Sequence, residues 1–287
     1  DYSSIQAGLT AAGINDTVYV QAGTYTENII WPETYGIKLI SAGDSSNTII
    51  DGGGLSSVIY MNPQSATIDT TTLIQGFKIM NGGNVSKGGG LLVSNSSPLL
   101  KEIHVSNNQS TTEGGGIHGY SSGLIITKSN VYNNSSPYGG GMWLEYSNVN
   151  FNEVKIMYNS CVGEGAGIRF SEGGSADISN SEISNNFGGS GVVTTSNTNN
   201  FNNVIFDGNT GAYYGGALNI YAGSNVNLDN CLIIRNSASH GGAIHNGAPS
   251  SLTINNTKIM YNHASYHGGA IRSTDNPTVN NAFIAYN

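Results

Sequence analysis

Apolar residues recur in pairs five positions apart along most of the chain, and an Asn follows each pair three positions later. Each pair comes after a glycine-rich box that closes on an apolar residue, such as Gly114-Gly115-Gly116-Ile117, and successive closing residues lie 24 to 27 positions apart. A fixed period in this range is typical of a stacked repeat architecture. The repeated sets are Leu100, Val105, Asn108; Ile126, Val131, Asn134; Phe151, Ile156, Asn159; Ile178, Ile183, Asn186; Phe201, Phe206, Asn209; Leu228, Ile233, Asn236; Ile254, Ile259, Asn262; and Val279, Ile284, Asn287.

Each repeat predicts three short strands and no helix. One strand follows the glycine box, as at 117–120, and the other two carry the two apolar residues of the pair. We therefore predict an all-β protein, a single-stranded right-handed parallel β-helix (β-solenoid) of about eleven coils, roughly 50 Å long at ~4.8 Å per coil. The glycines are expected where the chain turns tightly and lies close to the next coil. The recurrent Asn is expected to take a left-handed backbone and to hydrogen-bond along its column.

The first part of the chain has a different pattern. Residues 3–12 predict a short capping helix with Ser3 or Ser4 as its N-cap, which would cover the exposed edge of the first coil. Strands are expected at 16–20, 37–41, 48–51 and 58–61, with a turn at 22–25. We accordingly divide one continuous solenoid domain into a cap with the first coils (1–72) and regular coils of about 26 residues (73–287).

Composition narrows the classes of partner. Charged residues make up 10% of the chain and the net charge is -8, which argues against nucleic acid as a partner. No run of about 20 apolar residues is present, so we expect no membrane insertion by this segment. The two cysteines fall about three repeats apart, too far to bridge, and are expected to be free and buried.

The two ends of the sequence carry further expectations. The chain begins at Asp1 without a signal peptide, and we interpret it as a mature or excised segment. It stops at Asn287, where a new coil would begin, so we expect further coils, an anchoring module, or end-to-end self-association through an uncapped coil.

The repeats also carry a family resemblance. The boxes Gly215-Gly216-Ala217-Leu218 and Gly241-Gly242-Ala243-Ile244, with Phe206-x-x-Asn209, resemble repeats of chlamydial-type polymorphic outer membrane proteins and of secreted bacterial right-handed β-helix proteins. The segments at 4–7, 16–18, 23–29 and 49–52, with Phe77-x-Ile79-x-Asn81-Gly82, are similar to the first coils of the pectate-lyase-like superfamily. The resemblance covers nearly the whole chain. It implies the fold, and an extracellular or cell-surface location, rather than an activity.

Candidate binding residues stand in three outward columns beside the glycine boxes, where residue identities vary along a constant scaffold. Aromatic rings with carboxylates and an arginine suit sugar rings, whose apolar faces stack and whose hydroxyl groups hydrogen-bond. We therefore expect binding to an extracellular glycan or to a host or matrix surface, without catalysis, in adhesion, matrix or filament structure. The candidate residues are Glu113, His118, Tyr120, Tyr138, Trp143, Glu145, Glu164 and Arg169.

Several alternatives stay open. By the resemblance, a lyase would use an Arg or Lys base and Ca²⁺ held by carboxylates, and a hydrolase would use paired aspartates. No Asp pair occupies adjacent coils of one column. Glu145 and Arg169 would then be the acid and base, although an ion pair is the simpler account. No catalytic residue and no cofactor is predicted, Ca²⁺ being considered only for a lyase. His118, His240, His245 and His267 suggest a metal site, but His245 and His267, although in adjacent coils, occupy different columns without a carboxylate or third ligand nearby, so no metal site is predicted. A structural spacer and an ice-binding surface are further alternatives.

Overall fold

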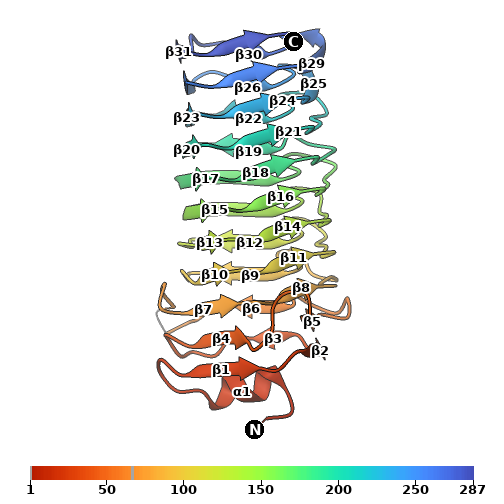
Figure 1. The fold of residues 1–287 in the computed structure, drawn as a ribbon, viewed down its shortest axis with the longest axis vertical. Helices are drawn as coiled ribbons and strands as arrows, with labels where there is room; N and C mark the ends of the chain where they lie inside the picture. The colour runs from red at the N-terminus through yellow and green to blue at the C-terminus, as the bar shows by residue number, and fades with distance from the viewer. Residues whose placement is uncertain (1, 66–67) are drawn as a thin grey trace.

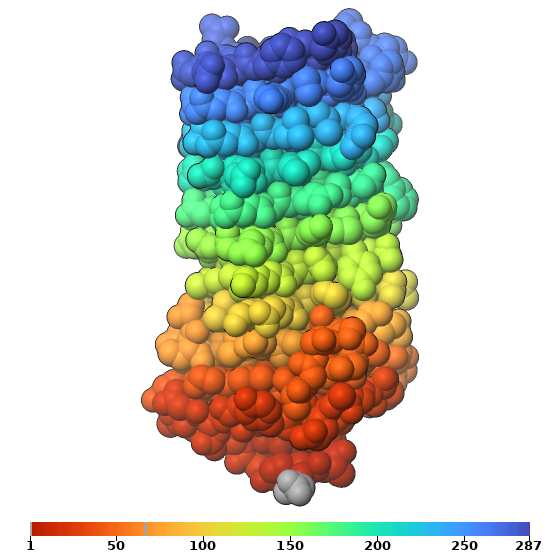
Figure 2. Space-filling model, in the orientation of Figure 1, coloured from red at the N-terminus to blue at the C-terminus, as the bar shows by residue number. Residues whose placement is uncertain are grey.

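The computed structural model describes residues 2–65 and 68–287 as one stack of coils that rises from the N-terminus to the C-terminus (Figure 1). In the space-filling view, successive coils appear as successive bands of colour along the stack (Figure 2). Every pairing between strands is parallel, and each strand pairs with its equivalents in the coils before and after it. The predicted parallel β-helix is confirmed.

Three columns of strands form the wall of the stack, as the three strands per repeat predicted. The first face follows the glycine boxes and contains β3 (Ile29–Ile30), β6 (Ile59–Met61), β9 (Leu91–Ser94), β12 (Ile117–Tyr120), β15 (Met142–Asn152), β17 (Ile168–Ser179), β19 (Val192–Thr195), β22 (Leu218–Tyr221), β26 (Ile244–Asn246) and β30 (Ile271–Ser273).

The second face carries the first apolar residue of each pair. It contains β1 (Thr17–Val20), β4 (Lys38–Ser41), β7 (Leu73–Gln75), β10 (Leu99–Lys101), β13 (Ile125–Thr127), the later halves of β15 and β17, and β20 (Thr198–Asn202), β23 (Asn225–Asp229), β27 (Ser251–Asn255) and β31 (Thr278–Asn280). Because β15 and β17 run through the corner without a break, they join the first and second faces into one sheet.

The third face has eleven described strands, which agrees with the predicted number of coils. They are β2 (Gly23–Thr26), β5 (Thr48–Asp51), β8 (Lys78–Met80), β11 (His104–Ser106), β14 (Asn130–Tyr132), β16 (Lys155–Met157), β18 (Glu182–Ser184), β21 (Ile205–Asp207), β24 (Leu232–Ile234), β28 (Lys258–Met260) and β32 (Phe283–Ala285). A two-stranded sheet of β25 (Ser237–His240) and β29 (His263–His267) lies before the last two glycine boxes.

The N-terminal cap is the short helix α1 (Ile5–Ala11), which packs against β1 and β3 with Ile5 and Leu9 buried. Ser4 is its N-cap and accepts a hydrogen bond from the backbone N–H of Ala7 at 3.1 Å. No helix among the described residues is long and apolar enough to span a membrane. The expected turn at 22–25 is wrong: most of it belongs to β2, because pairing with β5 holds this segment extended in spite of its turn-forming residues.

The repeated apolar residues fill the interior. Val105, Val131 and Ile156, for example, are fully buried, and only in the last coil are the equivalents Val279 and Ile284 exposed, among the described residues. Cys161 and Cys231 are free and buried, as predicted. Burial raises the pKa of the Cys161 thiol to about 12 and that of Cys231 to about 11, so both are protonated and unreactive at neutral pH.

The glycine boxes are tight turns that touch the next coil. The backbone of Gly114 has a φ of +62°, a value that glycine adopts more readily than other residues. A Cβ atom on Gly115 would lie 2.3 Å from the carbonyl oxygen of Ser135 in the following coil. The role expected for the glycines from their spacing is thus confirmed.

The recurrent Asn residues form a buried ladder, but the backbone part of the prediction is wrong. The Oδ1 atom of Asn134 accepts hydrogen bonds from both the backbone N–H and the side-chain amide of Asn108, each at 3.0 Å. Left-handed backbone occurs one residue earlier in the coil, at Asn107, Asn133 and also Tyr158. The physical reason is a division of roles: the exposed residue makes the corner, and the next residue directs its amide into the interior. The same arrangement continues through Asn159, Asn186, Asn209, Asn236 and Asn262 to Asn287.

Candidate functional site

The outward columns predicted beside the glycine boxes are present on the first face. His118 in β12 stands opposite Leu92 and Trp143 in the neighbouring coils, and Tyr120 stands opposite Glu145. Before the boxes, isolated bridges align Glu113 with the coils on either side of it. Because the register is unbroken, chemically different side chains from adjacent coils are brought side by side at the spacing of strands in a sheet.

Several side chains in the outward column formed by the second residue of each strand are covered rather than exposed. His118 has only 2% of its surface exposed, Asn219 4% and His245 8%, although all three alternate with core residues and point away from the interior. Neighbouring side chains of the other two columns screen them from water, as Glu113 and Glu145 do at His118. The first face therefore has a second layer of buried polar groups outside its sheet, which the alternation of the sequence did not indicate.

An ionic cluster occupies the coils of β9, β12 and β15. The Nε2 atom of His118 lies 3.4 Å from Oε2 of Glu113 and 3.8 Å from Oε1 of Glu145. The ammonium group of Lys87 lies 2.6 Å from the same oxygen of Glu113 and 3.9 Å from that of Glu145. The side chain of His118 and then the charge of Lys87 lower the pKa of Glu145, against the opposing effect of its burial.

No metal site was expected at His118, yet this histidine lies beside two carboxylates. Glu113 stands before the glycine box of one coil and Glu145 lies inside β15 of the next, in different columns. Comparing positions within one column could not reveal this pairing, because the two side chains converge diagonally over His118. Among the described residues, this trio is the one group of three acidic, His or Cys side chains with donor atoms within 4.8 Å of one another.

An aromatic and cationic cluster lies directly beside the ionic one. Tyr138 meets the Trp143 ring edge to face, with centroids 5.8 Å apart, and the Arg169 guanidinium lies 4.7 Å from the centroid of Trp143. Arg169 also forms an ion pair with Glu164. The Trp143 ring is therefore already engaged by two protein groups, whereas Tyr138 keeps 43% of its surface exposed.

Tyr221 was not among the expected site residues, yet it joins this cluster. Its hydroxyl group donates a hydrogen bond to Glu164, which lies 57 positions away in the sequence. Burial and this carboxylate raise the pKa of Tyr221. The coil between them carries Val193 and Thr195 on this face, and these short side chains let Tyr221 reach across it.

All eight expected residues thus lie on one patch of the first face, where β12, β15 and β17 are the fourth, fifth and sixth strands. We call it the coil 4–6 patch (Glu113, His118, Tyr120, Tyr138, Trp143, Glu145, Glu164 and Arg169). Tyr120 stands at one margin with 40% of its surface exposed and meets Tyr146 edge to face at 5.7 Å between centroids. The sequence missed Lys87 and Tyr221 as members, although the columns contain both.

A second patch lies further along the same face and has a different charge. Tyr214 stacks on His245 with centroids 4.4 Å apart, and His240 stacks on His267 at 5.3 Å. Burial, then the positive charge of Arg272, lowers the pKa of His245 to about 4, so its ring is neutral at pH 7. The second patch is thus an aromatic stack with one guanidinium.

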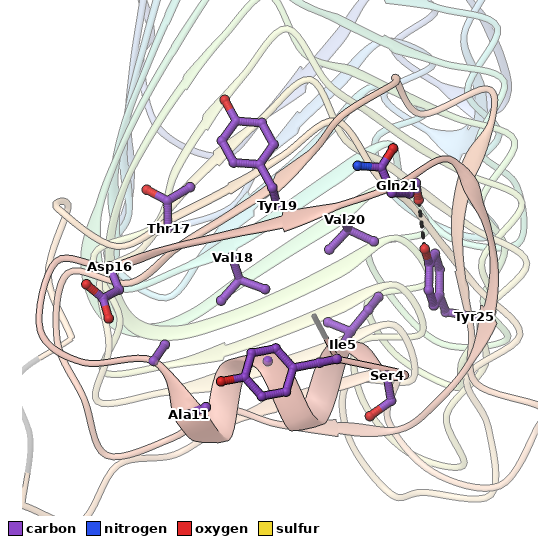
Figure 3. A pocket seen from close by; sticks show the side chains of 13 residues that line it. Ser4, Ile5, Ala11, Asp16, Thr17, Val18, Tyr19, Val20, Gln21 and Tyr25 are labelled. Atoms are coloured by element: carbon purple, nitrogen blue, oxygen red, sulfur yellow. Dashed lines mark hydrogen bonds between the residues drawn. The ribbon is translucent and has the colours of Figure 1, made fainter.

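Hollows in the surface lie elsewhere. One of about 460 Å³ opens at the N-terminal end between α1 and β1 (Figure 3), where Ile5, Val18 and Val20 line its floor. Another, of about 350 Å³, lies at the corner between the second and third faces and includes Asp44, His104 and Lys128. Neither contains a residue of the coil 4–6 patch, which lies along the first face of the sheet.

A family model and one solved structure agree with this architecture. The family model "Right handed beta helix region" matches residues 20–206. The A-module of mannuronan C-5 epimerase AlgE4 from Azotobacter vinelandii superimposes with a TM-score of 0.58 at 16% identity, over 98% of this chain and 90% of that one. A pectin methylesterase from Yersinia enterocolitica gives a TM-score of 0.39 at 13% identity, over 100% of this chain and 92% of that one. No curated protein matches the chain in sequence. Because the family model covers well over half of its residues, the chain belongs to the right-handed β-helix family.

Proposed function

We propose that the coil 4–6 patch binds a polysaccharide without cleaving it, and that the chain serves in adhesion or matrix structure outside the cell or on its surface. One observation carries the proposal: the half-exposed rings of Tyr120 and Tyr138 stand on adjacent coils with charged side chains around them. Sugar rings stack their apolar faces on aromatic rings and offer hydroxyl groups to charged partners. An open sheet face suits a long chain ligand better than a small molecule.

The geometry assigns different roles to the aromatic residues. Tyr120 and Tyr138 provide rings that a sugar can reach. Trp143 holds Tyr138 and Arg169 in place, because its own ring is engaged by both. Arg169 and Glu164 are held as an ion pair at the edge of the patch, where they can exchange hydrogen bonds with hydroxyl or carboxylate groups.

Isothermal titration tests the proposal, after a glycan array with pectins, alginates and host glycans, with and without Ca²⁺, has identified the ligand. Tyr120→Ala and Tyr138→Ala should each weaken binding by about tenfold, and Trp143→Ala by a similar factor through the loss of its support. Tyr120→Phe keeps the ring and should keep most of the affinity. Tyr19→Ala removes a still more exposed ring, with 67% of its surface exposed, at the distant N-terminal end and serves as the control. Unchanged binding in all the patch variants would contradict the proposal.

A polysaccharide-cleaving enzyme is the second candidate, and the Glu113–Glu145 pair favours it. One carboxylate oxygen of each lies within 4.8 Å of the other, close to the ~5 Å separation of the carboxyl pair in retaining glycosidases. Incubation with the ligand that the array identifies separates the two functions. New reducing ends or unsaturated products that Glu145→Gln abolishes would establish cleavage. Tight binding with neither product supports the non-catalytic function.

A further inference from the structure

His118 is a buried polar side chain without a matching partner. Its side chain is 3% exposed, and neither ring nitrogen forms a hydrogen bond with any described residue. A buried polar group in this state costs free energy, so such groups usually have a partner, an ordered water or an ion. The Nε2 atom faces Glu113 and Glu145, whose nearest oxygens approach it without hydrogen-bonding geometry.

Two of the distances among these three side chains are close to the edge of a metal coordination sphere, and all three donor atoms lie within 4.8 Å of one another. Donor atoms bound at 2.0–2.1 Å in a tetrahedral site lie about 3.3 Å apart. The distances from Nε2 of His118 to the nearest oxygens of Glu113 and Glu145 are 3.4 Å and 3.8 Å. The carboxylate of Glu145 would need to move only slightly toward His118 to reach a coordinating position.

A cation already occupies part of this space. The Nζ atom of Lys87 lies 2.6 Å from Oε2 of Glu113, and it is the positive charge nearest to both carboxylates. Two carboxylates thus face the ammonium group of a single lysine. The Lys87 side chain is 38% exposed, so it can swing into water when another cation takes its place.

We propose that Glu113, His118 and Glu145 form a site for one divalent transition-metal ion. The imidazole ligand favours Zn²⁺ or Co²⁺ over Ca²⁺ and Mg²⁺, which prefer oxygen ligands. Three protein ligands leave a fourth position for water or for a sugar hydroxyl group. The site does not depend on the polysaccharide proposal, because it rests on the side chains of the empty protein surface and is tested without a glycan.

Calorimetric titration of the chelator-treated protein with Zn²⁺ tests the site. The visible absorption spectrum of bound Co²⁺ reports the coordination of the metal. His118→Ala should abolish one equivalent of binding, and Glu113→Gln and Glu145→Gln should each weaken it by about tenfold or more. Lys87→Ala should strengthen binding by about fivefold, because it removes the competing ammonium group. That increase would not arise from loss of a merely structural residue.

The control is an ion pair without a histidine. Lys155 and Glu182 lie 3.6 Å apart on the third face, and Lys155→Ala and Glu182→Gln should leave Zn²⁺ binding unchanged. If His118→Ala fails to fold, the Co²⁺ spectrum of Glu145→Gln decides the question, since this substitution keeps the shape of the side chain. Equal stoichiometry and affinity in wild type, His118→Ala and Glu145→Gln would overturn the proposal, as would no binding at millimolar Zn²⁺. Metal binding without glycan binding would overturn only the polysaccharide proposal. Glycan binding without metal binding would overturn only the metal site.

Discussion

Two columns of side chains run along the same coils, one inside the stack and one outside it, and they differ in kind. Inside, the ladder keeps Asn from Asn108 to Asn262, and each amide bonds to the next. Outside, the column through His118, Trp143 and Arg169 changes its chemistry at every coil, although its strands pair in the same register. One backbone geometry thus supports both a constant column and a variable one.

The difference shows where a repeat protein is free to change. A buried amide has no water available, so its hydrogen bonds must come from the copies above and below it, and this requires the same residue in each coil. An outward side chain meets unlike neighbours from the adjacent columns, which can supply its partners, and no such requirement applies. The constant columns therefore determine the fold, and the variable columns determine any specific function.

Breaking the ladder should have the largest effect on stability. Oδ1 of Asn186 accepts two hydrogen bonds from Asn159, and its amide donates to the Ile156 carbonyl oxygen and to Asn209. Asn186→Ala leaves these buried groups unpaired and should lower the free energy of unfolding by about 3–5 kcal/mol. Urea denaturation followed by circular dichroism measures the loss.

An exposed Asn ladder on the second face provides the matched control. Asn200 accepts a hydrogen bond from Asn227 and donates one to Asp177, but all these groups can also reach water. Asn200→Ala should cost about 0.5 kcal/mol or less. Similar losses for Asn186→Ala and Asn200→Ala would show that burial is not what makes the inner ladder necessary.

Acid should weaken the second patch through His245, with an intermediate effect. The pKa of His245 falls from its ordinary 6.5 to about 4 in the folded protein, mainly through burial. The unfolded chain therefore binds a proton that the folded chain does not. The free energy of unfolding is unaffected above pH 6.5 and should fall by about 1–3 kcal/mol as the pH drops toward 4.

The substitution His245→Gln isolates this effect, because Gln can replace the hydrogen bond that His245 makes with Asn219. The loss of stability between pH 7.5 and pH 4.5, measured by urea denaturation, should be smaller in the variant than in wild type. Other groups, such as Glu145, titrate in both proteins and cancel in the difference. Equal losses would mean that His245 is protonated in the folded protein.

Apart from the Asn200→Ala control, the loss of the Tyr221 hydrogen bond should have the smallest effect on stability. Tyr221→Phe removes the bond to Glu164 but leaves the ring, and Glu164 keeps its ion pair with Arg169. The free energy of unfolding should fall by about 1 kcal/mol. A larger loss would show that the Tyr221 hydroxyl group stabilises the fold by more than its one hydrogen bond to the coil 4–6 patch.

Much of the fold could be predicted from the sequence because its signals are local and repeated. Val105 and Val131 alternate with polar neighbours, and an equivalent of Gly114 occurs in each regular coil where a tight turn is required. Each copy therefore supports the same prediction of a β-helix. The errors came where pairing with another coil decides the outcome. The strand β2 forms on β5 despite its turn residues, and the left-handed corner falls at Asn107 rather than Asn108.

The candidate site could be predicted only in part. Columns of equivalent positions brought Tyr138, Trp143 and Arg169 together correctly. They could not show that Glu113 and Glu145 meet over His118, because that contact depends on side-chain direction across columns. The contact between Tyr221 and Glu164 also depends on the short side chains of Val193 and Thr195, which lie on the coil between them.

The central claim is that the variable outward face binds a polysaccharide while the constant columns hold the fold. Calorimetric titration of the double variant Tyr120→Ala, Tyr138→Ala with the glycan that binds wild type tests it most directly, with thermal melting of the same sample. We predict a loss of affinity of about a hundredfold, two tenfold effects combined, with little change in the melting temperature. Wild-type affinity in this variant would contradict the claim.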